Sequence, residues 1–212
     1  MPSNPTKFNS TSLARVYDEY AQEMYATFKK VLAQIPCEAP STQRYSLARN
    51  CADCEAAYKT WLCSVAIPRC EDFSVDDPWL QPRALGQPFP DGSALADDVL
   101  ARFPNEKPAF AKSRNPNIDT VIQPGPYKEV LPCDDICYNL VQSCPSALGF
   151  ACPSPGRPGF NTSYGQRKAA DTNGSVTCNY PGSAHFFSAG SGSSASVTMA
   201  VSVCGLLLLL LL

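Results

Sequence analysis

Residues 133–144 read CDDICYNLVQSC and carry three closely spaced cysteines. In a helix, these spacings put Cys133, Cys137 and Cys144 on one face. Cys137 and Cys144 would then lie roughly 10 Å apart along the axis, whereas a disulfide needs Cα atoms within about 7 Å. Each cysteine must therefore bond to a different segment, which predicts a helix cross-linked to several other parts of the chain.

The remaining cysteines indicate that the whole fold depends on disulfides. The chain has 212 residues and eleven cysteines: Cys37, Cys51, Cys54, Cys63, Cys70, Cys133, Cys137, Cys144, Cys152, Cys178 and Cys204. Cys204 lies in a C-terminal apolar run that we expect to be removed, and its loss leaves an even number. Asn-x-Ser/Thr glycosylation sequons occur at Asn9, Asn161 and Asn173. Together these features predict folding in an oxidising compartment.

Helices are predicted where apolar residues recur every three or four positions. The first covers 11–35 and ends before Pro36. The second covers 53–66, with Asp53 as its N-cap, and a third covers about 131–144. The predicted fold class is therefore mainly α and disulfide-rich, with long irregular loops.

The composition divides the chain into unequal parts. We expect a disordered N-terminal segment, a cysteine-rich helical domain, a Ser/Gly stalk with an anchor attachment region, and a hydrophobic C-terminal signal, at 1–10, 11–181, 182–196 and 197–212 respectively. The first residues, MPSNPTKFNSTSL, contain no apolar run that could serve as a signal peptide. Since the other features require secretion, we expect the chain to lack the N-terminus of a longer protein.

The C-terminal run VTMAVSVCGLLLLLLL at 197–212 is apolar up to its last residue. A spanning helix needs about 20 apolar residues, and small residues followed by a terminal apolar run form the signal for a glycosylphosphatidylinositol (GPI) anchor. Ser188 is the expected attachment residue, with Gly190 and Ser183 as alternatives. A short tail-anchor helix is the competing interpretation.

A proline-rich insert at 71–130 separates the second and third helices, with one short helix expected within 93–103. An irregular segment of this length is too long for a passive connection, which favours a functional surface. The candidate partner-binding residues are Trp79, Phe89, Asp91, Arg114 and Asn115.

Little in the sequence supports catalysis, metal binding or nucleic-acid binding. The net charge is −2 without a basic block, so nothing would neutralise a run of phosphates. His185 is the only histidine, and Cys51-x-x-Cys54 lacks a second pair for a zinc site. The acidic pair Asp134-Asp135 begins a predicted helix, where the dipole favours carboxylates. We expect no enzyme activity and no cofactor.

Two stretches, WLCSVAIPRC at 61–70 and LPCDDICYNLVQSC at 131–144, resemble the Frizzled cysteine-rich domain. More closely, RYSLARNCADCEAAYKTWLCSVAIPRCEDFS and SRNPNIDTVIQPGPYKEVLPC resemble the C-terminal cysteine-rich part of the fungal mating-induced-death, or stretch-activated, calcium-channel component family. That resemblance implies an extracytoplasmic accessory subunit that works with a large four-repeat, voltage-gated-type pore protein in high-affinity calcium uptake.

The Frizzled resemblance also implies a disulfide pattern. Carried over in order, it gives Cys37–Cys70, Cys51–Cys63, Cys54–Cys144, Cys133–Cys178 and Cys137–Cys152. Cys51–Cys63 can close only if Cys51 lies off the predicted helix and its segment folds back along it. An exchange of partners, to Cys37–Cys63 and Cys51–Cys70, stays open.

Two functions from different classes follow. The first is a non-enzymatic subunit at the extracellular face of the plasma membrane that docks on a calcium-channel pore protein through the insert. The second is a GPI-anchored, Frizzled-like module that binds a lipid or another ligand. An apolar groove lined by the first helix would favour the second function.

Overall fold

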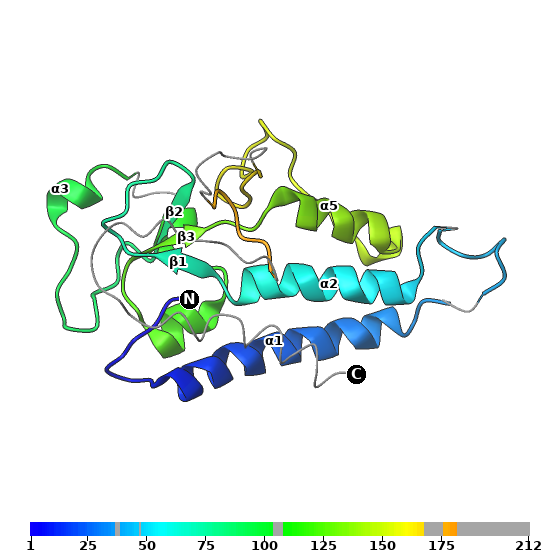
Figure 1. The fold of residues 1–212 in the computed structure, drawn as a ribbon, viewed down its shortest axis with the longest axis horizontal. Coiled ribbons are helices and arrows are strands. Elements are labelled where there is room, and N and C mark those ends of the chain that lie inside the picture. The colour runs from blue at the N-terminus through cyan, green and yellow to red at the C-terminus, as the bar shows by residue number, and fades with distance from the viewer. Residues whose placement is uncertain (37–38, 47, 104–107, 168–175, 182–212) are drawn as a thin grey trace.

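The structure is a computed structural model that describes residues 1–36, 39–46, 48–103, 108–167 and 176–181. Three long helices lie side by side in Figure 1, and a small sheet lies at one end of them. The elements, in chain order, are α1 (Ser10–Leu32), α2 (Cys51–Ala66), β1 (Arg69–Glu71), β2 (Leu80–Arg83), α3 (Asp97–Leu100), α4 (Pro108–Ala111), a π-helix (Ile118–Ile122), β3 (Tyr127–Val130), α5 (Asp134–Ser143) and a 3₁₀ turn (Ser146–Leu148).

Helix α1 begins one residue before the predicted start because Asn9 caps it. The Asn9 side-chain oxygen accepts a hydrogen bond of 2.8 Å from the Ser12 backbone N–H. The helix ends at Leu32, four residues before Pro36. Its buried face consists of Leu13, Tyr17, Ala21, Tyr25, Phe28 and Leu32, as the apolar period predicts.

Residues 1–10 were expected to be disordered, but the first of them pack against the domain. Asn4 is 3% exposed and its side-chain amide donates to the Gln123 backbone oxygen at 2.8 Å. The Tyr17 hydroxyl donates to the Pro2 backbone oxygen at 2.7 Å. Buried polar groups with such partners fix a short segment without needing an apolar run.

Helix α2 starts two residues earlier than predicted, at Cys51. Asn50, rather than Asp53, is the N-cap, and its side chain accepts from the Asp53 N–H at 3.1 Å. The Asp53 carboxylate accepts in return from the Asn50 N–H at 2.9 Å, which completes a capping box. Cys51 therefore lies on the helix and not before it.

This cap gives a first prediction. Asn50→Ala is expected to lower the free energy of unfolding by about 1 kcal/mol, because the Asp53 N–H loses its acceptor. Asn50→Ser, which keeps a side-chain oxygen, is the matched control and should lose much less. Urea denaturation with intact disulfides measures both, and equal losses for the two variants would contradict the cap.

The long helices form the larger core. The rings of Phe28 on α1 and Tyr58 on α2 stack with centroids 3.8 Å apart, and Leu140 of α5 belongs to the same cluster. A second cluster, around Tyr17 and Ile118, joins the start of α1 to the π-helix and β3. Each of the long helices α1, α2 and α5 thus buries its apolar face against the others or the insert.

The sheet was not predicted. Its strands are antiparallel and lie in the order β1-β3-β2, with Cys70 opposite Glu129 and Pro82 opposite Lys128. Strands β1 and β3 lie where the 71–130 insert begins and ends, and they pair with each other, so the insert leaves the helices and returns to them side by side. The fold class is thus disulfide-rich, with helices and a small sheet.

Three disulfides cross-link α5 and its flanks to separate segments. Cys54–Cys144 joins α2 to the end of α5, Cys133–Cys178 joins its start to the C-terminal segment, and Cys137–Cys152 joins its centre to the following loop. These are three of the pairings implied by the Frizzled resemblance. The Cys133–Cys178 connection is reinforced by backbone hydrogen bonds, from Cys133 N–H to the Asn179 oxygen and from Asn179 N–H to the Leu131 oxygen.

Two other implied pairings are wrong. Cys51 and Cys63 lie on one helix, twelve residues and about 18 Å apart, so they cannot bond to each other; each is bonded elsewhere. Cys70 carries a free thiol in β1, beyond the far end of α2 from Cys51. This excludes both Cys37–Cys70 and Cys51–Cys70. The partner of Cys37, including the alternative Cys37–Cys63, lies outside the described residues.

Candidate docking surface

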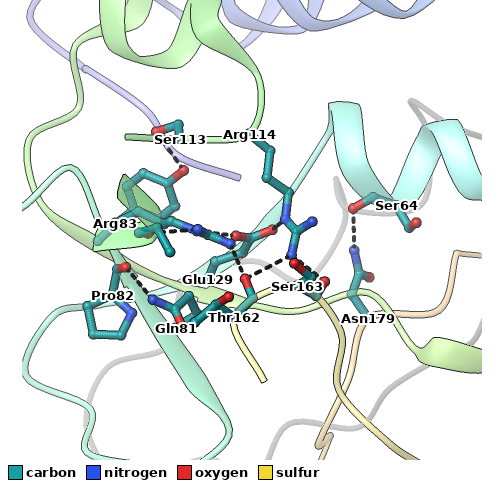
Figure 2. Close-up of polar contacts among 12 residues, drawn as sticks. Ser64, Gln81, Pro82, Arg83, Ser113, Arg114, Glu129, Thr162, Ser163 and Asn179 are labelled. Atoms are coloured by element: carbon teal, nitrogen blue, oxygen red, sulfur yellow. Dashed lines mark hydrogen bonds and ion pairs between the residues drawn. The ribbon is translucent and has the colours of Figure 1, made fainter. Parts of the chain in front are cut away.

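The insert is held at its base by a buried ion-pair triad (Figure 2). Glu129, on β3, is 1% exposed. One of its oxygens accepts from Arg83 Nε at 2.6 Å and the other from Arg114 Nε at 2.8 Å. Every residue of β3 is buried, so the sheet delivers this carboxylate into the interior and two arginines neutralise it there.

The two guanidinium groups extend the triad to other loops. Arg83 Nη1 donates to the Ala109 oxygen at 2.7 Å, and its Nη2 donates to the Thr162 oxygen at 3.0 Å. Arg114 Nη2 donates to the backbone oxygens of Thr162 and Ser163. Charge-assisted hydrogen bonds of this kind are stronger than neutral ones. The triad therefore fastens the insert both to the sheet and to the 161–163 loop.

Two predicted partner-binding residues belong to this interior and cannot form a contact surface. Arg114 is committed to Glu129, and its side chain is only 20% exposed. Asn115 is 1% exposed, donates to the Ala66 oxygen at 3.0 Å, and accepts from the Asn117 N–H at 3.0 Å. The polar stretch SRNPNID suggested a solvent-exposed loop, and no sequence pattern indicates that Asn115 is buried and Arg114 half-buried.

The other three candidates lie where a partner could reach them. Trp79 and Phe89 are half-buried and Asp91 is exposed. The Asp91 carboxylate accepts from the Ser93 hydroxyl and backbone N–H at 2.6 and 2.9 Å, and these bonds lower the pKa of Asp91. A side-chain acceptor of this type orders the turn without help from the rest of the fold.

The same insert contains an aromatic cluster that the sequence did not reveal. Phe103 lies between Phe73 and Phe110, with ring centroids 6.1 and 5.9 Å apart, and all three side chains are half-buried. Lys128 Nζ lies 5.2 Å from the Phe73 ring centroid and 3.3 Å from the Asp76 carboxylate. We call residues 86–103, which end at this cluster, the arm. In Figure 1 the arm includes α3 and lies at the sheet end of the molecule.

The arm packs against a glycine in a later part of the insert. Gly125 has φ +80°, and a Cβ placed on it would lie 2.8 Å from the Phe89 Cα. Gly149 has a similar φ of +69° with open space around it. Since no real Cβ tolerates the first distance, only glycine lets the arm pack this closely.

The two glycines form a matched test. Gly125→Ala is expected to destabilise the protein by about 1–3 kcal/mol more than Gly149→Ala, because only the first change adds overpacking to the cost of a positive φ. Thermal and urea denaturation measure the difference. Equal losses would show that the arm does not rest on Gly125.

The other predicted sites have separate outcomes. Asn9 and Asn161 are exposed, and their glycosylation stays a prediction. Asn173 and the anchor residues Ser183, Ser188 and Gly190 lie outside the described residues. Within the part of the chain that the structure describes, no group of three His, Cys, Asp or Glu side chains could hold a metal ion. None of the described helices is both long and apolar enough to cross a membrane.

Comparison with known proteins decides the family. Residues 1–184 match Mid1, the family of stretch-activated Ca²⁺-permeable channel components. The chain belongs to the Mid1 family. The Mid1 match covers the helices, the insert and all three described disulfides. It confirms the resemblance to the fungal stretch-activated calcium-channel component family. No solved structure matches the chain.

Mid1-family relatives include named channel proteins of three fungi. The chain is 41% identical over 191 residues to the stretch-activated cation channel yam8 of Schizosaccharomyces pombe, covering 90% of this chain and 33% of that protein. It is 36% identical over 147 residues to the stretch-activated cation channel MID1 of Saccharomyces cerevisiae, covering 69% and 22%. For MID1 of Cryptococcus neoformans the identity is 25% over 153 residues, covering 72% and 23%. The chain thus spans about a third or less of the length of these relatives.

Proposed function

We propose that the chain is a non-enzymatic, extracytoplasmic accessory domain of a calcium channel that promotes calcium influx by docking on a four-repeat, voltage-gated-type pore subunit. The family consists of stretch-activated Ca²⁺-permeable channel components. The observation that carries the docking proposal is the insert. Its base is fixed by the buried Glu129 triad, while Trp79, Phe89 and Asp91 remain within reach of a partner. Rigid presentation of aromatic side chains lowers the entropy lost on binding.

The cellular position belongs to the same proposal. We place the domain at the extracellular face of the plasma membrane, where a GPI anchor on Ser188 holds it. We also propose that its fold is related to the Frizzled cysteine-rich domain. The disulfides support passage through an oxidising compartment. Release of the protein from fungal membranes by phosphatidylinositol-specific phospholipase C tests the anchor, and retention would favour a tail-anchor helix.

Co-purification tests docking. The variant Phe89→Ser/Leu95→Ser removes two half-buried apolar side chains from the arm, and it is expected to reduce recovery of the co-expressed pore subunit at least about tenfold. Val31→Ser/Val141→Ser, at two exposed helix positions, is the matched control. Both variants should keep the far-ultraviolet circular dichroism of the parent. Full recovery with the arm variant would remove the arm from the interface.

One observation favours the second candidate function, a lipid- or ligand-binding module. An open, mainly apolar hollow lies between the end of α1 and the start of α2, with Lys29 and Glu55 among its lining residues. Its apolar lining includes Leu32, Ile35 and Pro36. Native mass spectrometry of protein purified without detergent would reveal a bound lipid, and a ligand-free spectrum would argue against this function.

A further inference from the structure

The end of the molecule formed by the α1–α2 connection is positively charged. Lys29, Lys30, Arg44 and Arg49 are exposed, and none of them forms an ion pair within the described parts of the chain. Residues 29–50 contain one acidic residue, Glu38, against these four basic ones. We call this part the basic end. Five other cations form ion pairs, namely Lys59, Arg83, Arg114, Lys128 and Arg167.

The basic end also carries the apolar hollow. Its lining is mainly apolar and includes two charged residues, Lys29 and Glu55. The Glu55 carboxylate is paired with Lys59 at 3.4 Å. Arg44 and Arg49 line a second hollow that shares Pro36 with the first. An apolar hollow lined by Lys29 and adjoining a second hollow with two arginines suits an acidic protein segment that presents apolar side chains, because one partner then satisfies both features.

The arm has these properties. Asp91, Asp97 and Asp98 are exposed and form no ion pair with any described residue. Leu95 and Val99 lie between and beside them and are half-buried. Arg102 is the only basic residue in 86–103. In Figure 1 the arm and the α1–α2 connection lie at opposite ends of the longest axis, so the arm cannot reach the basic end of its own chain.

We propose that the arm of one molecule docks on the basic end of a second copy. The two surfaces differ from each other and face opposite ways, so the contact is head-to-tail and can repeat along a row of molecules. The inference goes beyond the proposed function and does not rest on it. If both hold, self-association and channel docking compete for the arm.

Exposed ion pairs are weak, and charges are screened beyond about 8 Å at physiological ionic strength. The association is therefore expected to depend on salt and concentration. Sedimentation velocity of the full chain should show a weighted sedimentation coefficient that rises with protein concentration in 50 mM NaCl and stays flat in 500 mM NaCl. Association that persists in high salt would overturn the proposal, because apolar contacts alone would explain it.

Charge reversal gives the decisive test. Arg44→Glu/Arg49→Glu makes the basic end acidic, and Asp97→Lys/Asp98→Lys makes the arm basic. Each variant alone should weaken association at least about tenfold, since like charges then face each other. An equimolar mixture should associate again, because the reversed basic end of the first variant complements the reversed arm of the second, and the unchanged arm of the first complements the unchanged basic end of the second.

Arg15→Glu/Arg157→Glu is the matched control, since it changes the net charge as much as the first variant at two exposed positions outside both ends. It should associate like the parent. Loss of association in this control, or failure of the mixture to associate, would overturn the proposal. A lipid occupying the hollow in native mass spectra, together with a monomeric parent, would overturn it in favour of the lipid. Co-purification of the pore subunit is a separate measurement and can succeed or fail independently.

Discussion

Glu129→Gln is expected to lower the free energy of unfolding by about 3–5 kcal/mol, the range measured when one member of a buried ion pair is removed. Glutamine keeps the shape of the side chain but removes the charge that neutralises two guanidinium groups. Arg83 is 4% exposed, so water cannot replace the lost carboxylate there. The β3 strand, the 108–114 segment and the 161–163 loop should all lose order together.

Urea denaturation with the disulfides intact measures the loss for Glu129→Gln. Glu19→Gln, at an exposed position on α1, is the control and should change stability by less than about 0.5 kcal/mol. Hydrogen exchange of β2 and β3 amides should quicken in the first variant only. A loss below about 1 kcal/mol would mean that the triad is hydrated in solution.

Removing the Cys54–Cys144 bond should have a comparably large effect. The bond joins residues 90 apart in sequence, and in the chain-entropy description closing such a loop stabilises a protein by about 4–5 kcal/mol. Both sulfurs are buried between α2 and α5, with Cys54 at 0% exposure. Cys54→Ala/Cys144→Ala should therefore separate the two helices at much lower denaturant concentrations.

The Cys137–Cys152 bond supplies the comparison because it closes a separation of only 15 residues. Cys137→Ala/Cys152→Ala should cost about 3 kcal/mol, less than the first double variant. Denaturation midpoints of the two double variants, measured under identical conditions, test the order. A reversed order would show that local packing, rather than loop length, sets the contribution of each bond.

The helices could be predicted because their signals are local. The apolar period of α1 and the cysteine spacing of α5 each depend on residues within a few turns. The predicted start of a helix differs from the observed one where two nearby residues can both act as the N-cap, as Asn50 and Asp53 can at the start of α2. Apolar period alone cannot decide between two good capping residues that both take part in a capping box.

The sheet and the triad could not be predicted because their partners are distant in sequence. Arg83 and Glu129 are separated by 46 positions, and the strands that bring them together have only three or four residues without an alternating pattern. Arg114 and Asn115 therefore resembled loop residues. The predicted disulfides of Cys51 and Cys70 are also wrong. The pairing order carried over from Frizzled domains requires Cys51 to lie off the helix, whereas it lies on α2.

The connection of the C-terminal segment to α5 has a mechanical consequence. Cys178 is bonded to Cys133 at the start of α5, and Cys144 at its end is bonded to Cys54 on α2. Tension applied to the chain beyond residue 181 would first load the backbone hydrogen bonds of Asn179 and then the Cys133–Cys178 bond, which passes the load along α5 to the Cys54–Cys144 bond and into α2. We expect such a load path to transmit a pull along the helices as a rigid displacement, with little unravelling of the polypeptide.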